Sequence, residues 1–332
     1  MGELEGKQGI GPRLAPAEST HGETHALVVS HRGKIVAEHY GSGYSTPFGV
    51  DATYISWSMA KSITHALVGI LVGDGLLDVH MPAPVAQWAG SPRENITIQN
   101  LLEMRSGLRW VEDYVDGNSS HVIDMLFGAG IADHASYAAA LPLDHDPGAV
   151  WNYSSGTTNI ICGIIGDVVS RGIAGTPLTR RSVTERFIQE RLFAPLGMSS
   201  AVAKFDDAGN FVGSSYVYAT ARDFVKFGEL YMNDGWATNA SGVRERILPA
   251  GWMPHGRRVT ANDPDTDTCY GSHWWSWPLV ENSLVATGYE GQYTVVVPEA
   301  SLVVARLGKT DAQLRPAVME QLRSVVHHFT NL

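Results

Sequence analysis

Strand-like segments stand near both ends of this chain, and helical patterns fill the long stretch between them. Residues 25–40 alternate and turn as a β-hairpin does, with Gly33 in the turn. Further strand patterns, rich in Val and separated by Gly or Pro-Glu, follow at residues 270–277, 283–287, 293–297 and 302–307. Strands at both ends with helices between them are typical of an α+β fold. We therefore predict an antiparallel sheet flanked by helices, built from both chain ends, with a large inserted helical region.

The same order predicts how the chain divides into domains. Residues 1–24, rich in Gly, Pro and Glu, are expected to form a loose N-terminal arm. Residues 25–55 and 255–332 would form an α/β sheet domain, and residues 56–254 a mostly helical domain. Periodic apolar patterns predict helices at residues 58–72, 97–104, 121–140, 158–170, 183–193, 221–233 and 312–329. An active site would lie between the two domains.

The composition limits the classes of partner and site. The net charge of −10, without any run of Lys or Arg, argues against nucleic acid and anionic membranes as partners. No stretch reaches the ~18 apolar residues of a membrane helix, and residues 1–23 lack the apolar region of a signal peptide, so we expect a cytoplasmic protein. The two cysteines do not make a disulfide framework, and Cys162 is expected to be a small core residue. His21 and His25 have no third ligand, which favours a solvated tail; no metal and no cofactor are expected.

The helix predicted at residues 58–72 carries a polar stripe. Most of its positions are apolar or small, yet four polar residues stand at i, i+3, i+4 and i+7: Ser58, Lys61, Ser62 and His65. A buried lysine is unfavourable unless something pairs or uses it, and burial at a helix start lowers its pKa. A lysine tuned in this way can accept the proton of Ser58. The alternative is that Ser58 only caps the helix while Lys61 extends to solvent. Ser62 and His65 are expected to satisfy hydrogen bonds in the core.

Two further segments bring candidate groups. Tyr153 follows a Pro-Gly turn and precedes an apolar helix, at a junction where a side chain can reach a cleft. A phenol beside an ammonium has its pKa lowered and can pass a proton to a leaving group; the alternative is an ordinary half-buried aromatic. Glycines inside the strand pattern at residues 286–292 indicate close approach of a ligand, so that a free N–H there can help to hold an oxyanion. The alternative for this segment is a tight turn between two strands.

Other reaction centres have weaker patterns. No G-x-S-x-G elbow is present, which argues against an α/β-hydrolase. Gly308 and Lys309 resemble the end of a phosphate-binding loop, but Val303 stands where the loop needs glycine. No H-E-x-x-H and no paired C-x-x-C occurs. A Ser–His–Asp triad stays open by composition, since the chain has 13 histidines, but no local pattern singles out one of them and this argues against the triad.

Three short motifs follow one another along the chain. Residues 58–61 read Ser-Met-Ala-Lys, residues 153–155 read Tyr-Ser-Ser, and residues 286–288 read Ala-Thr-Gly. In this order and spacing they resemble the nucleophile, tyrosine and Lys-Thr-Gly motifs of the serine β-lactamase and penicillin-binding superfamily. The resemblance is to the class C-like branch, which includes family VIII carboxylesterases and 6-aminohexanoate-dimer hydrolases. It extends over residues 25–328, with secondary stretches at residues 96–108, 195–198 and 221–223. It implies a β-lactamase/transpeptidase-like fold.

Two departures from the family pattern bear on the substrate. Ala286 replaces a lysine that the family associates with recognition of the β-lactam carboxylate. Ser155 replaces an asparagine that in β-lactamases contacts the acylamide side chain. The resemblance therefore implies cleavage of small-molecule esters or linear amides rather than of β-lactams or D-Ala-D-Ala peptides.

The resemblance also implies roles for the candidate residues of a cofactor-free serine hydrolase. Ser58 would attack a carbonyl and form an acyl-enzyme. Lys61 and Tyr153 would act as one proton-transfer unit, and which of them takes the Ser58 proton stays open. The backbone N–H groups of Ser58 and Tyr289 would hold the oxyanion.

Further residues are expected around this centre to bind the substrate, namely Trp110, Tyr114, Ser155 and Gly288. The acidic loop with Glu112, Asp113 and Asp116 would favour a cationic or neutral substrate. Two alternatives stay open: a β-lactamase or D,D-peptidase, and, from another class, a non-catalytic ligand-binding protein on the same fold. The oligomeric state is not predicted.

Overall fold

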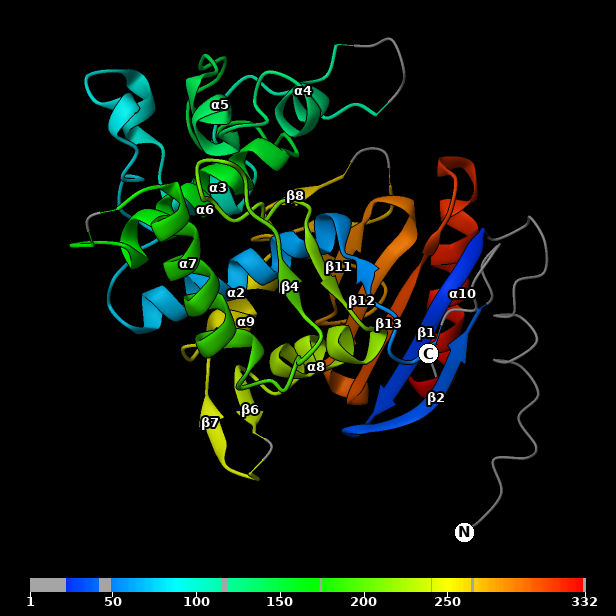
Figure 1. Cartoon of the computed structure of the whole chain (residues 1–332). Helices are drawn as coiled ribbons and strands as arrows, with labels where there is room; N and C mark the ends of the chain where they lie inside the picture. The colour runs from blue at the N-terminus through cyan, green and yellow to red at the C-terminus, as the bar shows by residue number, and fades with distance from the viewer. Residues whose placement is uncertain are drawn as a thin grey trace, which may run out of the picture.

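A mixed architecture of one large antiparallel sheet and many helices is seen in the computed structural model, which describes residues 22–41, 49–114, 119–173, 175–239, 241–263 and 266–330. Within these residues the main sheet has 8 strands (Figure 1). From edge to edge they are β2 (Lys34–Tyr40), β1 (Glu23–His31), β13 (Leu302–Lys309), β12 (Gln292–Val297), β11 (Leu284–Gly288), β10 (Trp275–Ser276), β9 (Cys269–Tyr270) and β8 (Ala261–Asn262). The N-terminal hairpin therefore joins the C-terminal strands. This confirms the predicted α+β fold with a sheet built from both chain ends.

Strand β1 is apolar on both sides because both faces of the sheet are covered. Ala26 and Val28 belong to the core shared with the inserted helices. Leu27 and Val29 belong to the core under α10 (Arg315–Thr330), as the two-residue period of a strand requires. In Figure 1, α10 lies on one side of the sheet and α8 (Ala221–Met232) on the other.

The residues between the two parts of the sheet fold mainly into helices. The central one, α2 (Ala60–Gly73), is buried from Ala60 to Leu71. It shares one hydrophobic core with α8 and with α6 (Ser155–Val169), where Cys162 is fully buried as predicted. The other helices are α3 (Ile98–Leu102), α4 (His121–Phe127), α5 (His134–Ala140), α7 (Pro177–Ile188) and α9 (Trp252–Arg257). Two small sheets are made by β3 (Tyr54–Ile55), β5 (Val217–Ala219) and β4 (Val202–Ala203), and by β6 (Trp236–Thr238) and β7 (Arg244–Arg246).

Two predicted elements are each a pair of shorter elements, and the helix predicted at residues 183–193 begins earlier, at Pro177. The helix predicted at residues 121–140 is two helices, because the Asp133 side chain accepts a hydrogen bond from Ser136 N and so begins a new helix. The strand predicted at residues 270–277 is the β9–β10 hairpin, in whose turn His273 takes a φ of 55°. Both segments contain turn residues at which the element divides, Gly128, Gly130 and Asp133 in the first and Gly271 and Ser272 in the second.

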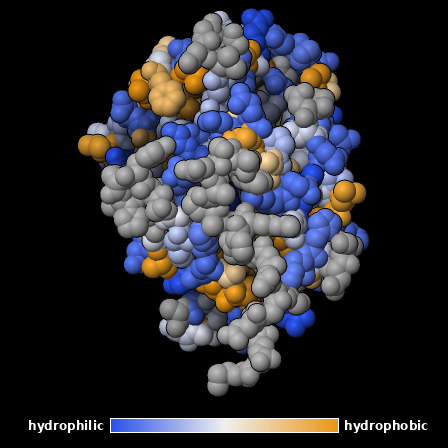
Figure 2. Space-filling model, turned by 90° about the vertical axis from the view of Figure 1, so that its right-hand side faces the viewer, coloured by the Kyte–Doolittle hydropathy of each residue, from blue (hydrophilic) through white to orange (hydrophobic). Residues whose placement is uncertain are grey.

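Figure 2 shows a mainly hydrophilic face on which apolar side chains form separate small patches, apart from the grey residues. No described helix has the length and apolar character needed to cross a membrane. The predicted arm at residues 1–24 lies almost wholly outside the described residues, and the predicted domain bounds stay a prediction.

Candidate active site

Ser58 lies in a short 3-10 turn, η1 (Trp57–Met59), that leads into α2. The helix thus begins after Ser58, and no side chain caps either element. Ser56 fixes the turn, because its N–H donates to the Val217 carbonyl over 2.8 Å and its Oγ accepts from Val217 N over 3.0 Å. Trp57 has a φ of 43°, a left-handed conformation that is strained for a bulky residue. The backbone therefore presents Ser58 at a defined place.

Lys61 is buried beneath Ser58. With 2% exposure its side chain does not extend to solvent. Its Nζ donates to Ser58 Oγ over 2.9 Å, to Ser155 Oγ over 2.9 Å and to the Ser214 carbonyl over 3.0 Å. Burial lowers the pKa of Lys61 to about 8, and the nearby Glu112 carboxylate acts in the opposite direction. A lysine with this pKa is partly neutral near neutral pH and can accept a proton.

Tyr153 lies on another side of the lysine. Lys61 Nζ is 4.9 Å from the centre of the Tyr153 ring, which packs against Trp275 at 5.6 Å and Tyr270 at 5.9 Å. Contrary to the prediction, burial raises the pKa of Tyr153, although a hydrogen bond with Ser58 acts in the opposite direction. The phenol therefore keeps its proton near neutral pH, as a proton donor does.

Glu112 turns inward and accepts four hydrogen bonds. Its Oε1 accepts from Ser155 Oγ over 2.6 Å and from Tyr114 OH over 2.7 Å. Its Oε2 accepts from Trp110 Nε1 over 2.5 Å and from Ser155 N over 2.9 Å. These donors occupy the carboxylate, so Glu112 is not free to receive a cationic substrate as the acidic loop was predicted to do. Asp116 of that loop lies outside the described residues.

The strand end predicted to supply the second oxyanion donor lies directly beside η1. At Gly288, the last residue of β11, a Cβ would lie 2.3 Å from the Ser56 carbonyl oxygen, so only glycine lets the two backbones approach. Tyr289 follows, with its ring centre 5.0 Å from that of Tyr114, which is 38% exposed. Ser58 and Tyr289 are thus on neighbouring segments, and their use as oxyanion donors stays a prediction. The same holds for substrate contact by Tyr114 and Gly288.

Trp110, also predicted to line the substrate cleft, is only 7% exposed. A Cβ on Gly156 would lie 2.5 Å from its indole ring, so the ring packs tightly on the first turn of α6. Ser155, in the same turn, is fully buried. Direct substrate contact by Trp110 and Ser155 stays a prediction, and their observed partners are protein groups.

The other two polar residues of the α2 stripe serve the core, as predicted. Ser62 Oγ donates to the His273 carbonyl over 2.8 Å. His65 lies 2.7 Å from Tyr231 OH through Nδ1 and 3.0 Å from His255 Nδ1 through Nε2. Both side chains are therefore satisfied away from Ser58.

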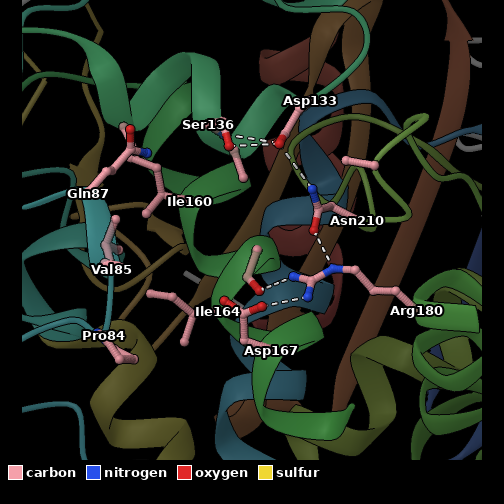
Figure 3. Close-up of a pocket in the computed structure, with 15 residues that line it drawn as sticks. Pro84, Val85, Gln87, Asp133, Ser136, Ile160, Ile164, Asp167, Arg180 and Asn210 are labelled. Carbon is pink, nitrogen blue, oxygen red and sulfur yellow. Dashed lines mark hydrogen bonds and ion pairs between the residues drawn. The ribbon is translucent and has the colours of Figure 1, made fainter. Parts of the chain in front are cut away.

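A groove of about 500 Å³ runs along another part of α6, and none of the predicted site residues lines it (Figure 3). Its polar wall is internally bonded, because Arg180 donates from Nε to Asn210 Oδ1 over 2.8 Å and from Nη1 to Asp167 Oδ1 over 2.5 Å. Asn210 Nδ2 in turn donates to Asp133 Oδ1 over 3.2 Å. Asp167 and Arg180 of the groove are thus paired with one another, and the groove does not belong to the Ser58 site.

Three contacts of this site were missed from the sequence. The Ser214 carbonyl that holds Lys61 is a backbone group, which leaves no signal in a residue pattern. Tyr270 and Trp275, which pack against Tyr153, were assigned to a single strand, and only the hairpin turn brings them together.

Comparison with known proteins agrees with the geometry. A family model described as Beta-lactamase matches residues 16–324. A 6-aminohexanoate-dimer hydrolase of Paenarthrobacter ureafaciens is 24% identical over 302 residues, which is 86% of this chain and 72% of that protein. Two solved structures share the fold. A Bacillus anthracis protein provisionally assigned as a 6-aminohexanoate-dimer hydrolase has a TM-score of 0.76 at 20% identity, with 93% of this chain and 80% of that one covered. A family VIII carboxylesterase has a TM-score of 0.64 at 16% identity, with 90% and 93% covered.

The family model matches nearly the whole chain, and the relatives are of the two kinds that the motifs indicated. The predicted resemblance is thereby confirmed. The chain belongs to the β-lactamase family, whose fold it shares with amide and ester hydrolases.

Proposed function

We propose that this chain hydrolyses ester or linear amide bonds of small molecules through an acyl-enzyme on Ser58. The observation that carries the proposal is the 2.9 Å contact between Lys61 Nζ and Ser58 Oγ, made by a lysine whose pKa is lowered to about 8. Ser58 Oγ would attack the carbonyl carbon and give its proton to the unit formed by Lys61 and Tyr153. That unit would then protonate the leaving alcohol or amine, and water would release the acid.

The choice of substrate rests on Ala286, which stands where the family motif has a lysine. Ala286 is buried in β11 opposite Thr294 and offers no cation to a β-lactam or peptide carboxylate. The names of the relatives, a 6-aminohexanoate-dimer hydrolase and a family VIII carboxylesterase, agree with linear amides and esters. Esters and linear amides are therefore the first substrates to test.

One observation favours the runner-up, hydrolysis of β-lactams or D,D-peptides. The Arg315 guanidinium lies 4.6 Å from the centre of the Tyr289 ring, at the end of β11. A cation there can attract an anionic substrate group in the absence of a lysine at position 286. The comparison of ester with cephalosporin turnover described next separates these two candidates.

The experiment compares hydrolysis of short-chain p-nitrophenyl esters by the wild-type protein and by Ser58→Ala. We expect loss of turnover in the variant and a fluorophosphonate adduct on Ser58 in the wild type, seen by intact mass and peptide mapping. Ser62→Ala is the matched control, because Ser62 stands on the same buried helix and donates to the His273 carbonyl. It should keep its turnover.

Three results would contradict the proposal. Full activity in Ser58→Ala, or an adduct on another serine, would remove Ser58 as the nucleophile. Ligand that binds and is recovered unchanged, without an adduct, would favour a non-catalytic binding protein. Cephalosporin turnover at rates near or above those of the esters would favour a β-lactamase. Loss of that turnover in Arg315→Ala would indicate that Arg315 attracts the anionic group of the substrate.

A further inference from the structure

Lys61 is surrounded by partners whose hydrogen-bond directions are fixed by their chemistry. The Ser214 carbonyl, 3.0 Å from Nζ, can only accept. Ser155 Oγ, 2.9 Å from Nζ, has one proton to donate and lone pairs to accept with. That proton has a receiver already, since Glu112 Oε1 lies 2.6 Å from Ser155 Oγ. An ionised carboxylate has no proton of its own, so Ser155 donates to Glu112 and accepts from Lys61.

This direction decides where the Lys61 lone pair points. A neutral amine has two N–H bonds and one lone pair. The two N–H bonds go to Ser155 and to the Ser214 carbonyl, which leaves the lone pair facing Ser58 Oγ at 2.9 Å. The serine proton can then move to Nζ without any other group turning. After the transfer, the three N–H bonds of the ammonium match its three acceptors.

We propose that Glu112 is a positioning residue, which holds the Ser155 hydroxyl proton and thereby points the Lys61 lone pair at Ser58. The inference rests on the proposed function, because it takes Ser58 as the nucleophile. As the bond from Ser58 Oγ to the substrate carbonyl carbon forms, the serine O–H bond breaks and its proton passes to Lys61 Nζ. The electron pair of the carbonyl π bond moves to the carbonyl oxygen.

The carboxylate is itself held in one orientation. Its Oε2 accepts from two groups that can only donate, Trp110 Nε1 and Ser155 N. Its Oε1 is left for two hydroxyls, those of Ser155 and Tyr114. Trp110 cannot withdraw easily, since its ring packs against the α-carbon of Gly156. The loop that carries Glu112 is therefore locked onto the first turn of α6.

Glu112 also supplies the negative charge that lies near Lys61. Among the described residues, four titratable side chains contact the lysine or interact with it electrostatically: Glu112 and Tyr153 from loops, Cys162 from α6 and His273 from the β9–β10 turn. Burial raises the pKa of Tyr153 and raises that of Cys162 to about 12, and it lowers the pKa of His273 to about 3. These three are neutral at working pH. The Glu112 charge alone among the four therefore favours the ammonium form of Lys61.

Glu112→Gln tests the inference with little change in size. The two obligate donors at Oε2 demand the amide oxygen there, which puts the amide NH2 group against Ser155 Oγ. Ser155 then accepts from the amide and donates its own proton to the Lys61 lone pair, so the base is turned away from Ser58. We expect kcat/KM at high pH to fall about tenfold or more. The acid limb of the pH profile should move down by about one pH unit, because a favourable negative charge is lost.

A double-mutant cycle separates positioning from a merely structural role. In Ser155→Ala the link is already broken, so adding Glu112→Gln should cost at most about twofold more at high pH. Glu38→Gln is the matched control, because Glu38 also accepts three hydrogen bonds, from Arg222 and Tyr40, far along the chain on β2. It should leave the profile unchanged. Melting temperatures are compared for all variants. If Glu112→Gln does not fold, Ser155→Ala alone tests the inference: a tenfold loss of kcat/KM at high pH supports it, and a loss under twofold overturns it.

The possible failures are distinguishable. If Ser58 is labelled by fluorophosphonate and Glu112→Gln keeps both its high-pH rate and its acid limb, the inference is wrong and the proposed function stands. Additive losses in the double variant also overturn it, since they assign Glu112 a structural role. If Ser58→Ala keeps its activity, the proposed function fails first and takes the inference with it.

Discussion

The pH dependence of acylation is the sharpest prediction from the buried lysine. The perturbation is a change of pH from 9.5 to 5.5, at which we measure kcat/KM, a quantity that reports on the free enzyme. Only neutral Lys61 can take a proton, and burial lowers its pKa to about 8. The active fraction is then about one half at pH 8, about a tenth at pH 7 and about a hundredth at pH 6. The rate should therefore rise with pH and level off above about 8.

The assay uses a p-nitrophenyl ester read at the isosbestic wavelength of the product, with spontaneous hydrolysis subtracted. Each acid-treated sample is returned to pH 8.5 and assayed again, so that irreversible unfolding is not taken for titration. A rate that still rises about tenfold per pH unit up to pH 9.5 would indicate an ordinary exposed lysine, whose pKa is near 10.4, and a limb near pH 6.5 would indicate a histidine base. Either result, or a flat profile, would refute the assignment of Lys61 as the titrating base.

Three other changes test the site and its scaffold. Tyr153→Phe should reduce kcat for an anilide about 100-fold but that for a p-nitrophenyl ester much less, because p-nitrophenolate leaves without a proton; equal losses would remove Tyr153 as the donor. Gly69→Ala puts a Cβ 2.4 Å from Trp252 Nε1, so urea unfolding should show a loss of about 1–3 kcal/mol, while Gly73→Ala on the same helix meets nothing closer than 3.6 Å and should lose none. Burial lowers the pKa of His255 to about 4, below its unfolded value of about 6.5, so stability is lost as pH falls through that window, by about 2 kcal/mol at pH 5. Denaturant titrations at several pH values give the free energy of unfolding, which should fall less steeply with decreasing pH in His255→Gln than in the wild type. An equal dependence on pH in both proteins would contradict the reasoning.

The sheet could be predicted from the sequence because its strands have strong two-residue or continuous apolar patterns. Those patterns end at Gly and Pro, which mark turns between strands. The strand at residues 302–307 needed only two more residues at its end to match β13. The hairpin in residues 270–277 was missed although Gly271 and Ser272 stand in its turn, and the residue with a left-handed backbone there is His273 rather than the glycine.

The part of the candidate site that is made by residues close together in the sequence was predictable. The part that depends on contacts between distant segments was not. Ser58 and Lys61 are three residues apart, so one turn of chain brings them together. The direction of the Tyr153 pKa was predicted wrongly, because burial of the phenol and the nearby Glu112 charge both raise it. Glu112 was assigned to an acidic loop that would favour a cationic or neutral substrate, since nothing in its local sequence indicates that Ser155 lies against it.

The position of β1 between β2 and β13 has a consequence for how the protein is made. The ribosome delivers β1 near the beginning and β13 near the end, so the hairpin must wait with one edge open while the helical region is synthesised. Closing a loop of nearly the whole chain is entropically unfavourable, and an open apolar edge invites pairing with other chains. A chain that stops before Leu302 would contain every residue of the candidate centre and still leave the edge of β1 that faces β13 unpaired. We therefore expect such a product to aggregate during synthesis rather than to accumulate as an active fragment.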